Sequence, residues 1–487
     1  MKLFEPLAIK NMVLPNRIMV PAMVTRMANE EGWVVPDVID RYVRYAEGGA
    51  GLIVLEAIAV HQSKAGNLLR ICDDRYIDGL RELTKRVHDT SDSKIVPQII
   101  HFLKVSLSGW RQTVDMLSLA DIDRIVDQFG DAVRRARQAG FDGAELHSAH
   151  AYTLSSFLSR RNGRTDEYGG DSLEGRLHMI GRVMENVRRK VGDDFPVGIR
   201  FNADEFILGG YTLEDSKLMA LRFAQLGFDY ISLSVGGKFE DAVHVPGHVF
   251  FPYTGYSGDR CMPNEWYPKA PHAYLAGAIK AFINAKGYDV PVAAAGKLDD
   301  PAVAEQVLVD GTMDFVAIAR GLLADPSWPN KVKKGELDRI IRCDHCNVCK
   351  HLAGTHKVVN CFLWPKGSNQ APADDPTVGA PSWGLDKGGL TARFDNGTVE
   401  LSWSKAPGAV RYEVCRADGD GRVHITDAVK TARALDHDTL AGMRYHYYVR
   451  AYAATGQGGP PSNTVVVEPR WPADAPPPRP AVAAAAR

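Results

Sequence analysis

Eight short apolar runs recur between residues 15 and 325, and this alternation constrains the fold more than any other feature. Each run is nearly all apolar and is followed by a polar loop, which is typical of parallel strands covered on both faces. Longer amphipathic stretches, such as 122–139 and 173–191, lie between the runs and predict helices. The runs are Ile18–Val20, Gly51–Leu55, Lys94–Ile99, Gly143–Leu146, Pro196–Arg200, Asp229–Leu233, Val290–Ala294 and Asp314–Ile318.

Eight β-α repeats over about 310 residues fit a TIM barrel better than an open doubly wound sheet, which usually has fewer strands. No Gly-x-Gly-x-x-Gly turn follows an early run, which argues further against a Rossmann fold. We therefore predict an α/β fold with a TIM (β/α)8 barrel over residues 1–342.

The composition changes after Trp364-Pro365. Residues 366–382 are rich in Pro, Gly, Ala and Asp and predict a linker. Residues 383–470 hold short alternating strands separated by turns, which predicts a small all-β sandwich. This region resembles a fibronectin type III module, because Ala441-Gly442-x-x-Tyr445 is similar to a tyrosine corner. The Pro- and Ala-rich tail, 471–487, is expected to be disordered.

Four of the seven cysteines fall within 19 residues, which predicts a metal centre over residues 343–365. Three thiolates in one short turn suit the corners of an iron–sulfur cubane, whereas structural zinc usually takes two separated Cys-x2-Cys pairs. The spacing favours a 4Fe–4S cluster over zinc, with reduced structural cysteines as the remaining alternative. Cys72 and Cys261 lie apart and are expected to be buried or loop thiols. The predicted metal ligands are Cys343, Cys346, Cys349 and Cys361.

Charge and composition narrow the expected partners. The net charge is −1, so no charge bias suggests a nucleic-acid or membrane partner. The first residues, Met1–Pro6, form no secretory signal, and no run reaches the ~20 apolar residues that a membrane span needs. Clustered cysteines without such a signal fit a reducing cytoplasm. We expect a cytoplasmic homo-oligomer that acts on a small-molecule substrate.

The fourth apolar run ends in His147-Ser-Ala-His150-Ala-Tyr152, and chemistry in a TIM barrel sits at the carboxyl ends of the strands. The two imidazoles can donate hydrogen bonds to an oxygen that gains negative charge, and the phenol can deliver a proton. A single His here would more often be structural. Two His with a Tyr predict catalytic residues.

These residues resemble the old yellow enzyme family of FMN-dependent barrel oxidoreductases over Leu3 to about Pro365. The shared motifs include Pro15-Asn16-Arg17, Glu56-Ala57 and His147-x-x-His150-x-Tyr152. The cysteine segment is similar to the iron–sulfur branch, which includes 2,4-dienoyl-CoA reductase and trimethylamine dehydrogenase, and its spacing is closer to the latter. The fibronectin-like module stands where that branch carries a nucleotide-binding extension.

The resemblance implies an FMN site. The loop 21–25 would lie against the flavin ring, Gln98 at its pyrimidine edge and Arg200 near N1. A solvated Gln98 and a structural ion pair of Arg200 are the alternatives. The loops at 295–297 and 319–321 would hold the phosphate, although the family more often has Gly at position 319. The implied FMN contacts are Pro21, Met23, Thr25, Ala57, Gln98, Arg200, Gly296, Lys297, Ala319 and Arg320.

The resemblance also implies a reaction. NADH or NADPH would reduce the FMN, and the enzyme would then reduce the activated C=C bond of an α,β-unsaturated carbonyl compound. An amine dehydrogenase or demethylase that passes electrons to a carrier protein is the first alternative. A non-catalytic barrel scaffold that carries a binding sandwich is the second.

Overall fold

The computed structural model describes residues 1–62, 66–104, 110–236, 258–263, 267–365, 367–372, 381–395, 397–417, 423–453 and 458–470. The chain divides into two compact units, Met1–Gly379 and Ala380–Arg487. Residues 366 and 373–380 of the expected linker, 366–382, lie outside the described residues, as does the whole of the expected tail, 471–487.

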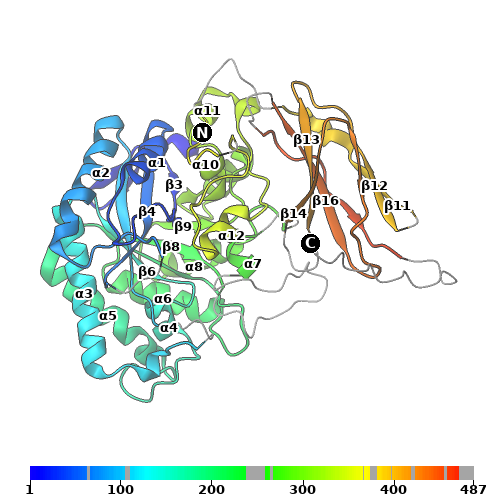
Figure 1. Ribbon diagram of the computed structural model, residues 1–487. Coiled ribbons are helices and arrows are strands. Elements are labelled where there is room, and N and C mark those ends of the chain that lie inside the picture. The colour runs from blue at the N-terminus through cyan, green and yellow to red at the C-terminus, as the bar shows by residue number, and fades with distance from the viewer. Residues whose placement is uncertain are drawn as a thin grey trace. The chain divides into compact units, whose positions relative to one another are not determined.

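The first unit contains a closed barrel of eight parallel strands, in which β10 pairs with β3 to complete the ring. Each of the eight predicted runs overlaps one of these strands, so the TIM-barrel prediction is confirmed (Figure 1). The strands are β3 (Ile18–Val20), β4 (Leu52–Ala59), β5 (Lys94–Ile100), β6 (Ala144–Ser148), β7 (Val197–Asn202), β8 (Tyr230–Ser234), β9 (Val292–Ala295) and β10 (Phe315–Ala317).

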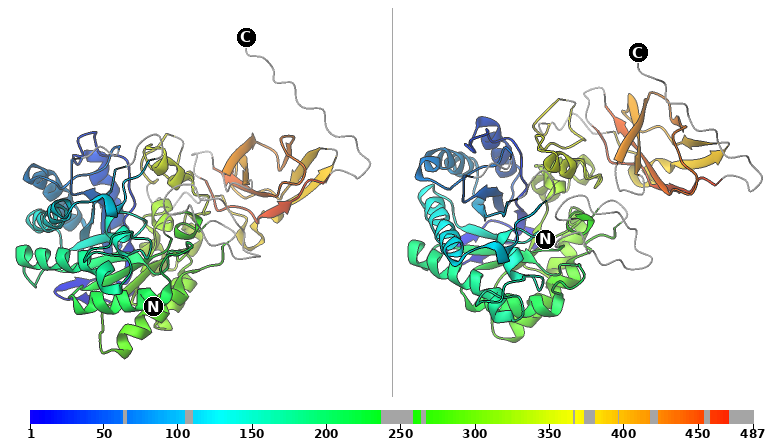
Figure 2. Two further views of the ribbon diagram at one scale, coloured as in Figure 1. Left: turned by 90° about the horizontal axis from the view of Figure 1, so that it is seen from below. Right: turned by 60° about the horizontal axis from the view of Figure 1, so that its bottom comes forward.

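Helices surround the strands. In Figure 1 α2, α3 and α5 lie outside the barrel, and Figure 2 shows these blue to cyan helices around it from other sides. Helix α3 begins before its apolar stripe because Ser118 and Asp121 form a capping box. The helices are α1 (Pro36–Glu47), α2 (Ile77–Thr90), α3 (Leu119–Gln138), α4 (Thr153–Leu158), α5 (Leu173–Val191), α6 (Leu213–Gln225), α7 (Gly258–Cys261), α8 (Ala273–Ala285), α9 (Pro301–Val309), α10 (Arg320–Ala324), α11 (Trp328–Lys334) and α12 (Val348–Gly354).

The core explains why the runs are continuous in sequence. Every residue of β4 is buried, because one face meets the barrel interior and the other meets the helices. A hairpin of β1 (Leu7–Ile9) and β2 (Met12–Leu14) packs Ile9 and Leu14 against strand residues such as Tyr230 and Phe315. Leu52, Val96, Tyr230 and Phe315 of this interior cluster lie near the start of their strands, and the chemistry of such barrels sits at the opposite end, where the strands finish.

The second unit consists of two antiparallel sheets, as the all-β prediction requires. Its core includes Trp403, Tyr412 and Tyr447, and the Tyr445 hydroxyl accepts a hydrogen bond from the Leu440 N–H at 2.9 Å. In the three-stranded sheet the neighbouring strands are, in order, β11 (Thr391–Asp395), β12 (Thr398–Ser402) and β15 (Arg433–Asp436). In the four-stranded sheet they are β14 (Val423–Val429), β13 (Arg411–Ala417), β16 (Tyr445–Tyr452) and β17 (Val465–Val467).

None of the described helices combines the length and the apolar character that crossing a membrane would require.

Candidate active site

The structure brings together the three side chains predicted at the end of β6. The His147 ring centroid lies 5.2 Å from that of His150 and 5.0 Å from that of Tyr152. His150 and Ala151 both adopt left-handed backbone conformations, with φ of 60° and 59°. Such conformations cost roughly 1 kcal/mol or more each in residues other than glycine and concentrate at functional sites. The two residues turn the chain sharply between β6 and α4, so that all three rings share the barrel rim.

Both imidazoles are neutral near pH 7. The Ala149 N–H donates to His147 Nδ1 at 3.3 Å, so the proton of the neutral His147 ring sits on Nε2 and can be donated. Burial is the main reason that the pKa of His147 lies well below its usual range, and electrostatic repulsion from His150 and Arg200 lowers it further. Burial, with Arg200 and Lys350, lowers the pKa of His150 to about 3. The pair therefore offers hydrogen bonds without carrying charge.

His150 has two neighbours that the sequence did not indicate. Its Nε2 lies 2.6 Å from the Ser234 hydroxyl oxygen and 3.3 Å from the Cys261 sulfur. Ser234 ends β8 and could have been found as a polar residue at a strand end. Cys261 was expected to be a buried or loop thiol, and α7 brings it to the histidine pair. Cys261 and His150 are 111 positions apart in the sequence, which explains why no local pattern revealed the contact.

Polar residues predicted to face the flavin are buried at the same end of the barrel. Gln98 Nε2 donates to Glu145 Oε1 at 2.7 Å, which fixes the orientation of the amide. Arg200 Nη1 donates to the Ser232 hydroxyl at 2.8 Å. The positive charge of Arg200 counteracts the effect of burial, which raises the pKa of Glu145. Ala57 lies at a register shift between β4 and β5, and such irregularities are common beside active sites.

Thr25, which the resemblance places in the flavin loop, makes two hydrogen bonds with Glu56. Its hydroxyl donates to Glu56 Oε1 at 2.6 Å, and its backbone N–H donates to Glu56 Oε2 at 3.0 Å. The Tyr42 hydroxyl accepts from the Glu56 N–H at 2.8 Å. Both donors of Thr25 therefore contact one buried carboxyl. The signal that could have revealed this network is an acidic residue within the apolar run of β4.

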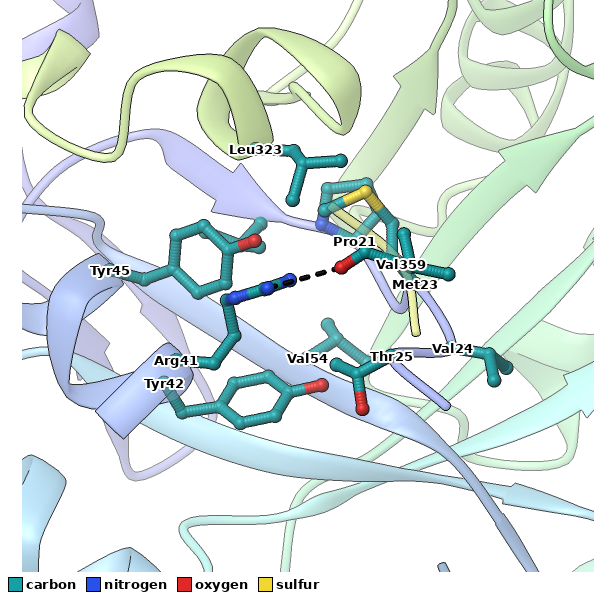
Figure 3. A pocket seen from close by; sticks show the side chains of 11 residues that line it. Pro21, Met23, Val24, Thr25, Arg41, Tyr42, Tyr45, Val54, Leu323 and Val359 are labelled. Atoms are coloured by element: carbon teal, nitrogen blue, oxygen red, sulfur yellow. Dashed lines mark hydrogen bonds between the residues drawn. The ribbon is translucent and has the colours of Figure 1, made fainter. Parts of the chain in front are cut away.

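The loop with Pro21 and Met23 lines a small pocket that separates it from α1 (Figure 3). Figure 3 shows Arg41 reaching between Tyr42 and Tyr45 toward the carbonyl oxygen of Val359. Arg41 Nη2 donates to that oxygen at 3.1 Å and to the Asn369 carbonyl at 2.6 Å. The predicted flavin loop is thus close to the segment that carries Cys361.

The two loops predicted to hold phosphate are both built at strand ends. Gly296 has φ of +136°, and a Cβ there would come within 2.6 Å of His272 Nδ1, so the position requires glycine. Lys297 donates to the Tyr267 carbonyl at 2.6 Å. Ala319 precedes the first residue of α10, Arg320, which donates from Nη1 to Asn347 Oδ1 at 2.6 Å. Arg320 therefore contacts the cysteine segment.

The four clustered cysteines share one environment. Burial raises the pKa of the thiols of Cys343 and Cys346 well above their usual range and that of Cys361 to about 12, and it also raises the pKa of Cys349. The His345 N–H donates to Cys343 at 3.3 Å, and backbone N–H groups act on the other three thiols. Among the described His, Cys, Asp and Glu residues, no group of three or more could hold a metal ion.

Known proteins with similar sequences are named as oxidases, dehydrogenases and reductases. The chain is 35% identical to an NADH oxidase of Thermoanaerobacter brockii over 71% of this chain and 53% of the relative. It is 30% identical to an N,N-dimethylglycine/sarcosine dehydrogenase of Chromohalobacter salexigens over 71% and 50%. It is 29% identical to a cinnamate reductase of Clostridium sporogenes over 74% and 57%. The chain therefore spans about half the length of these relatives.

Structural and family comparisons agree with the fold. The structure of a 2-naphthoyl-CoA reductase complexed with 2-naphthoyl-CoA matches with a TM-score of 0.66 and 22% identity, over 78% of this chain and 59% of that chain. The NADH:flavin oxidoreductase / NADH oxidase family matches residues 2–252 and 270–339, which is more than half of the sequence. The predicted family is thereby confirmed, and the chain belongs to the NADH:flavin oxidoreductase / NADH oxidase family of flavin-dependent oxidoreductases.

Proposed function

We propose that this protein is an FMN and iron–sulfur oxidoreductase that uses NADH or NADPH to reduce activated C=C bonds of α,β-unsaturated carbonyl compounds. One observation carries the proposal: two neutral imidazoles and a tyrosine share the rim of the barrel. The name of the cinnamate reductase supports this substrate class, because cinnamate has a C=C bond conjugated to a carboxyl group. Membership in an oxidoreductase family argues against the non-catalytic scaffold.

The residues at the rim have separate roles in this reaction. His147 and His150 donate hydrogen bonds to the carbonyl oxygen of the substrate, where negative charge develops as the β-carbon is reduced. Tyr152 holds the proton that the α-carbon receives. Bound FMN would supply hydride transfer. Because the histidines are neutral, their donors are present throughout the physiological pH range.

The chain's own residues fit an FMN at this end of the barrel. Arg200 places a buried positive charge beside the histidine pair, which suits a flavin that gains negative charge on reduction. Gly296, at a position that requires glycine, lies in the loop after β9 where the phosphate would bind. Pro21, Met23 and Ala57 would contact the ring, and Gln98 would meet its edge. The phosphate of the FMN would contact Lys297, Ala319 and Arg320.

A 4Fe–4S cluster suits the cysteine segment better than a single zinc ion. The Cys343-x2-Cys346-x2-Cys349 spacing supports this, because three thiolates in one short turn suit the corners of a cubane, whereas structural zinc usually takes two separated Cys-x2-Cys pairs. Backbone N–H groups reach all four sulfurs and favour the thiolate form that binds metal. Metal binding would displace the protons that burial retains on the thiols.

Amine oxidation is the second candidate. The name of the dimethylglycine/sarcosine dehydrogenase and the Cys-x2-Cys-Asn-Val-Cys spacing support it. Electrons would then leave through the cluster to a carrier protein.

Anaerobic stopped-flow spectroscopy separates the two reactions. The proposal expects that NADH or NADPH bleaches the flavin bands and that cinnamate or an enone restores them. Tyr152→Phe should keep the first step and slow the second, because only the second needs the proton. Bleaching by an N-methylated amine, with no response to a reduced nicotinamide, would contradict the proposal and support the dehydrogenase.

A further inference from the structure

Arg320 lies between the barrel rim and the cysteine segment. It is the first residue of α10 and is only 8% exposed. Nη1 donates to Asn347 Oδ1 at 2.6 Å, and Nη2 donates to the Pro263 carbonyl at 2.8 Å. Two arms of one guanidinium therefore hold two segments that are far apart in sequence. The guanidinium of arginine is planar and has donors at fixed positions, so it holds two such partners at once better than the flexible ammonium group of lysine would.

Asn347 is the partner that matters for the cysteines. It lies between Cys346 and Cys349 and adopts φ of 59°, a left-handed conformation that Asn tolerates better than most residues. Its Oδ1 accepts from Arg320, and its Nδ2 donates to the Met262 carbonyl at 2.8 Å. Both ends of the amide are thus fixed, and the turn that spaces these two cysteines is fixed with them.

The charge of Arg320 lies beside the cysteine segment. Its Nη1 is 2.6 Å from the side-chain oxygen of Asn347, which directly follows Cys346. Arg320 is only 8% exposed, so solvent ions screen its charge poorly. Arg320 is therefore a buried cation beside the turn that carries Cys346 and Cys349, two of the four predicted ligands.

We infer that Arg320 is a positioning residue for the iron–sulfur segment, which fixes the turn at Asn347 and holds a positive charge beside the cluster. This inference rests on the proposed function and adds to the phosphate contact that the sequence predicted. Adding an electron makes a cluster more negative, so a nearby buried cation favours the reduced state. Loss of that cation makes the cluster harder to reduce.

The test compares Arg320→Met with Arg342→Met in anaerobically prepared full-length protein. Arg342 is adjacent to Cys343 in sequence, but its guanidinium donates to the Leu337 carbonyl at an exposed site. A redox titration followed by electron paramagnetic resonance gives the midpoint potential, and iron and sulfide analysis gives the cluster content. Arg320→Met should shift the reduction equilibrium about tenfold toward the oxidised cluster, which is ~59 mV for a one-electron couple. Arg342→Met should match the wild type.

Arg320→Lys tests the fork separately from the charge. The lysine keeps the cation but cannot hold Asn347 and Pro263 together, so cluster content should fall while the potential of the remaining cluster stays near the wild-type value. This variant also tests the inference if Arg320→Met does not fold. If Arg320→Lys has the cluster content and the midpoint potential of the wild type, the guanidinium is not needed to position the segment, and the inference is overturned.

Different results would overturn the proposed function and the inference about Arg320. A wild-type protein that takes up no iron and sulfide on reconstitution would overturn the proposed function itself. A wild-type protein with a cluster, and an Arg320→Met variant with the same potential and iron content, would overturn the inference alone. Loss of FMN from Arg320→Met with an unaltered cluster would assign Arg320 to the flavin phosphate only and would also overturn it.

Discussion

Glu56 should make the stability of the barrel unit fall as pH rises. Its carboxyl is fully buried, and burial raises its pKa from 4.5 to about 7 against the hydrogen bonds of Thr25. Between pH 4.5 and 7 the folded protein keeps a proton on Glu56 that the unfolded chain has released. A group that binds its proton more tightly when folded stabilises the fold at low pH, and this stabilisation is lost as pH rises through the folded pKa.

The size of the effect follows from the shift. Each pKa unit corresponds to about 1.4 kcal/mol, so a shift of about 2.5 units predicts a loss of about 3 kcal/mol in the free energy of unfolding between pH 4.5 and 7. Glu56→Gln keeps the shape and an acceptor for Thr25 but has no proton to lose. The variant should therefore gain about 3 kcal/mol relative to the wild type across the same window.

Urea unfolding followed by tryptophan fluorescence at half-unit intervals from pH 4.5 to 8 measures this difference. The second unit unfolds in both proteins alike, so its contribution cancels between variant and wild type. Glu47→Gln is the control, because the Glu47 side chain is half exposed at the end of α1. Parallel pH profiles for the wild type and Glu56→Gln would refute the reasoning about the buried carboxyl.

Three further predictions concern other parts of the chain. Tyr152→Phe should slow flavin reoxidation by an enone about 10²- to 10⁴-fold without weakening substrate binding, as measured by single-turnover kinetics. Binding of a neutral carbonyl ligand at the histidine pair should be constant from pH 5 to 8 by equilibrium titration, because the pKa of His150 is about 3; a loss of affinity near pH 6.5 would contradict this. Asp436→Ala removes the buried carboxylate 2.8 Å from Arg416 and leaves the exposed Asp438 carboxylate at 3.5 Å, so it should destabilise the second unit by about 3 kcal/mol in calorimetry, whereas an unchanged melting temperature would show that the buried pair contributes little.

The barrel was predictable because burial on both faces leaves a continuous apolar run at each strand. All eight runs coincide with strands to within a few residues, and His147, His150 and Tyr152 share the rim as their spacing suggested. The hairpin of β1 and β2 was not predicted. It lies before the first β-α repeat, and its middle residues are exposed, whereas the equally short strands β3 and β10 are buried throughout.

Contacts between distant segments could not be read from the sequence. Cys261 meets His150 and Arg320 meets Asn347 because loops at different strand ends converge in space. The hydrogen bonds from Thr25 to Glu56 likewise join positions 31 residues apart, which no local pattern reveals. Where a side chain has several possible partners in the sequence, only the folded structure shows which of them it contacts.

The visible spectrum of anaerobically purified protein, combined with analysis of FMN, iron and sulfide, tests the central claim most directly. The account predicts flavin bands with a broad iron–sulfur shoulder, and equal amounts of iron and sulfide. A colourless protein that takes up neither FMN nor iron and sulfide on reconstitution would contradict it.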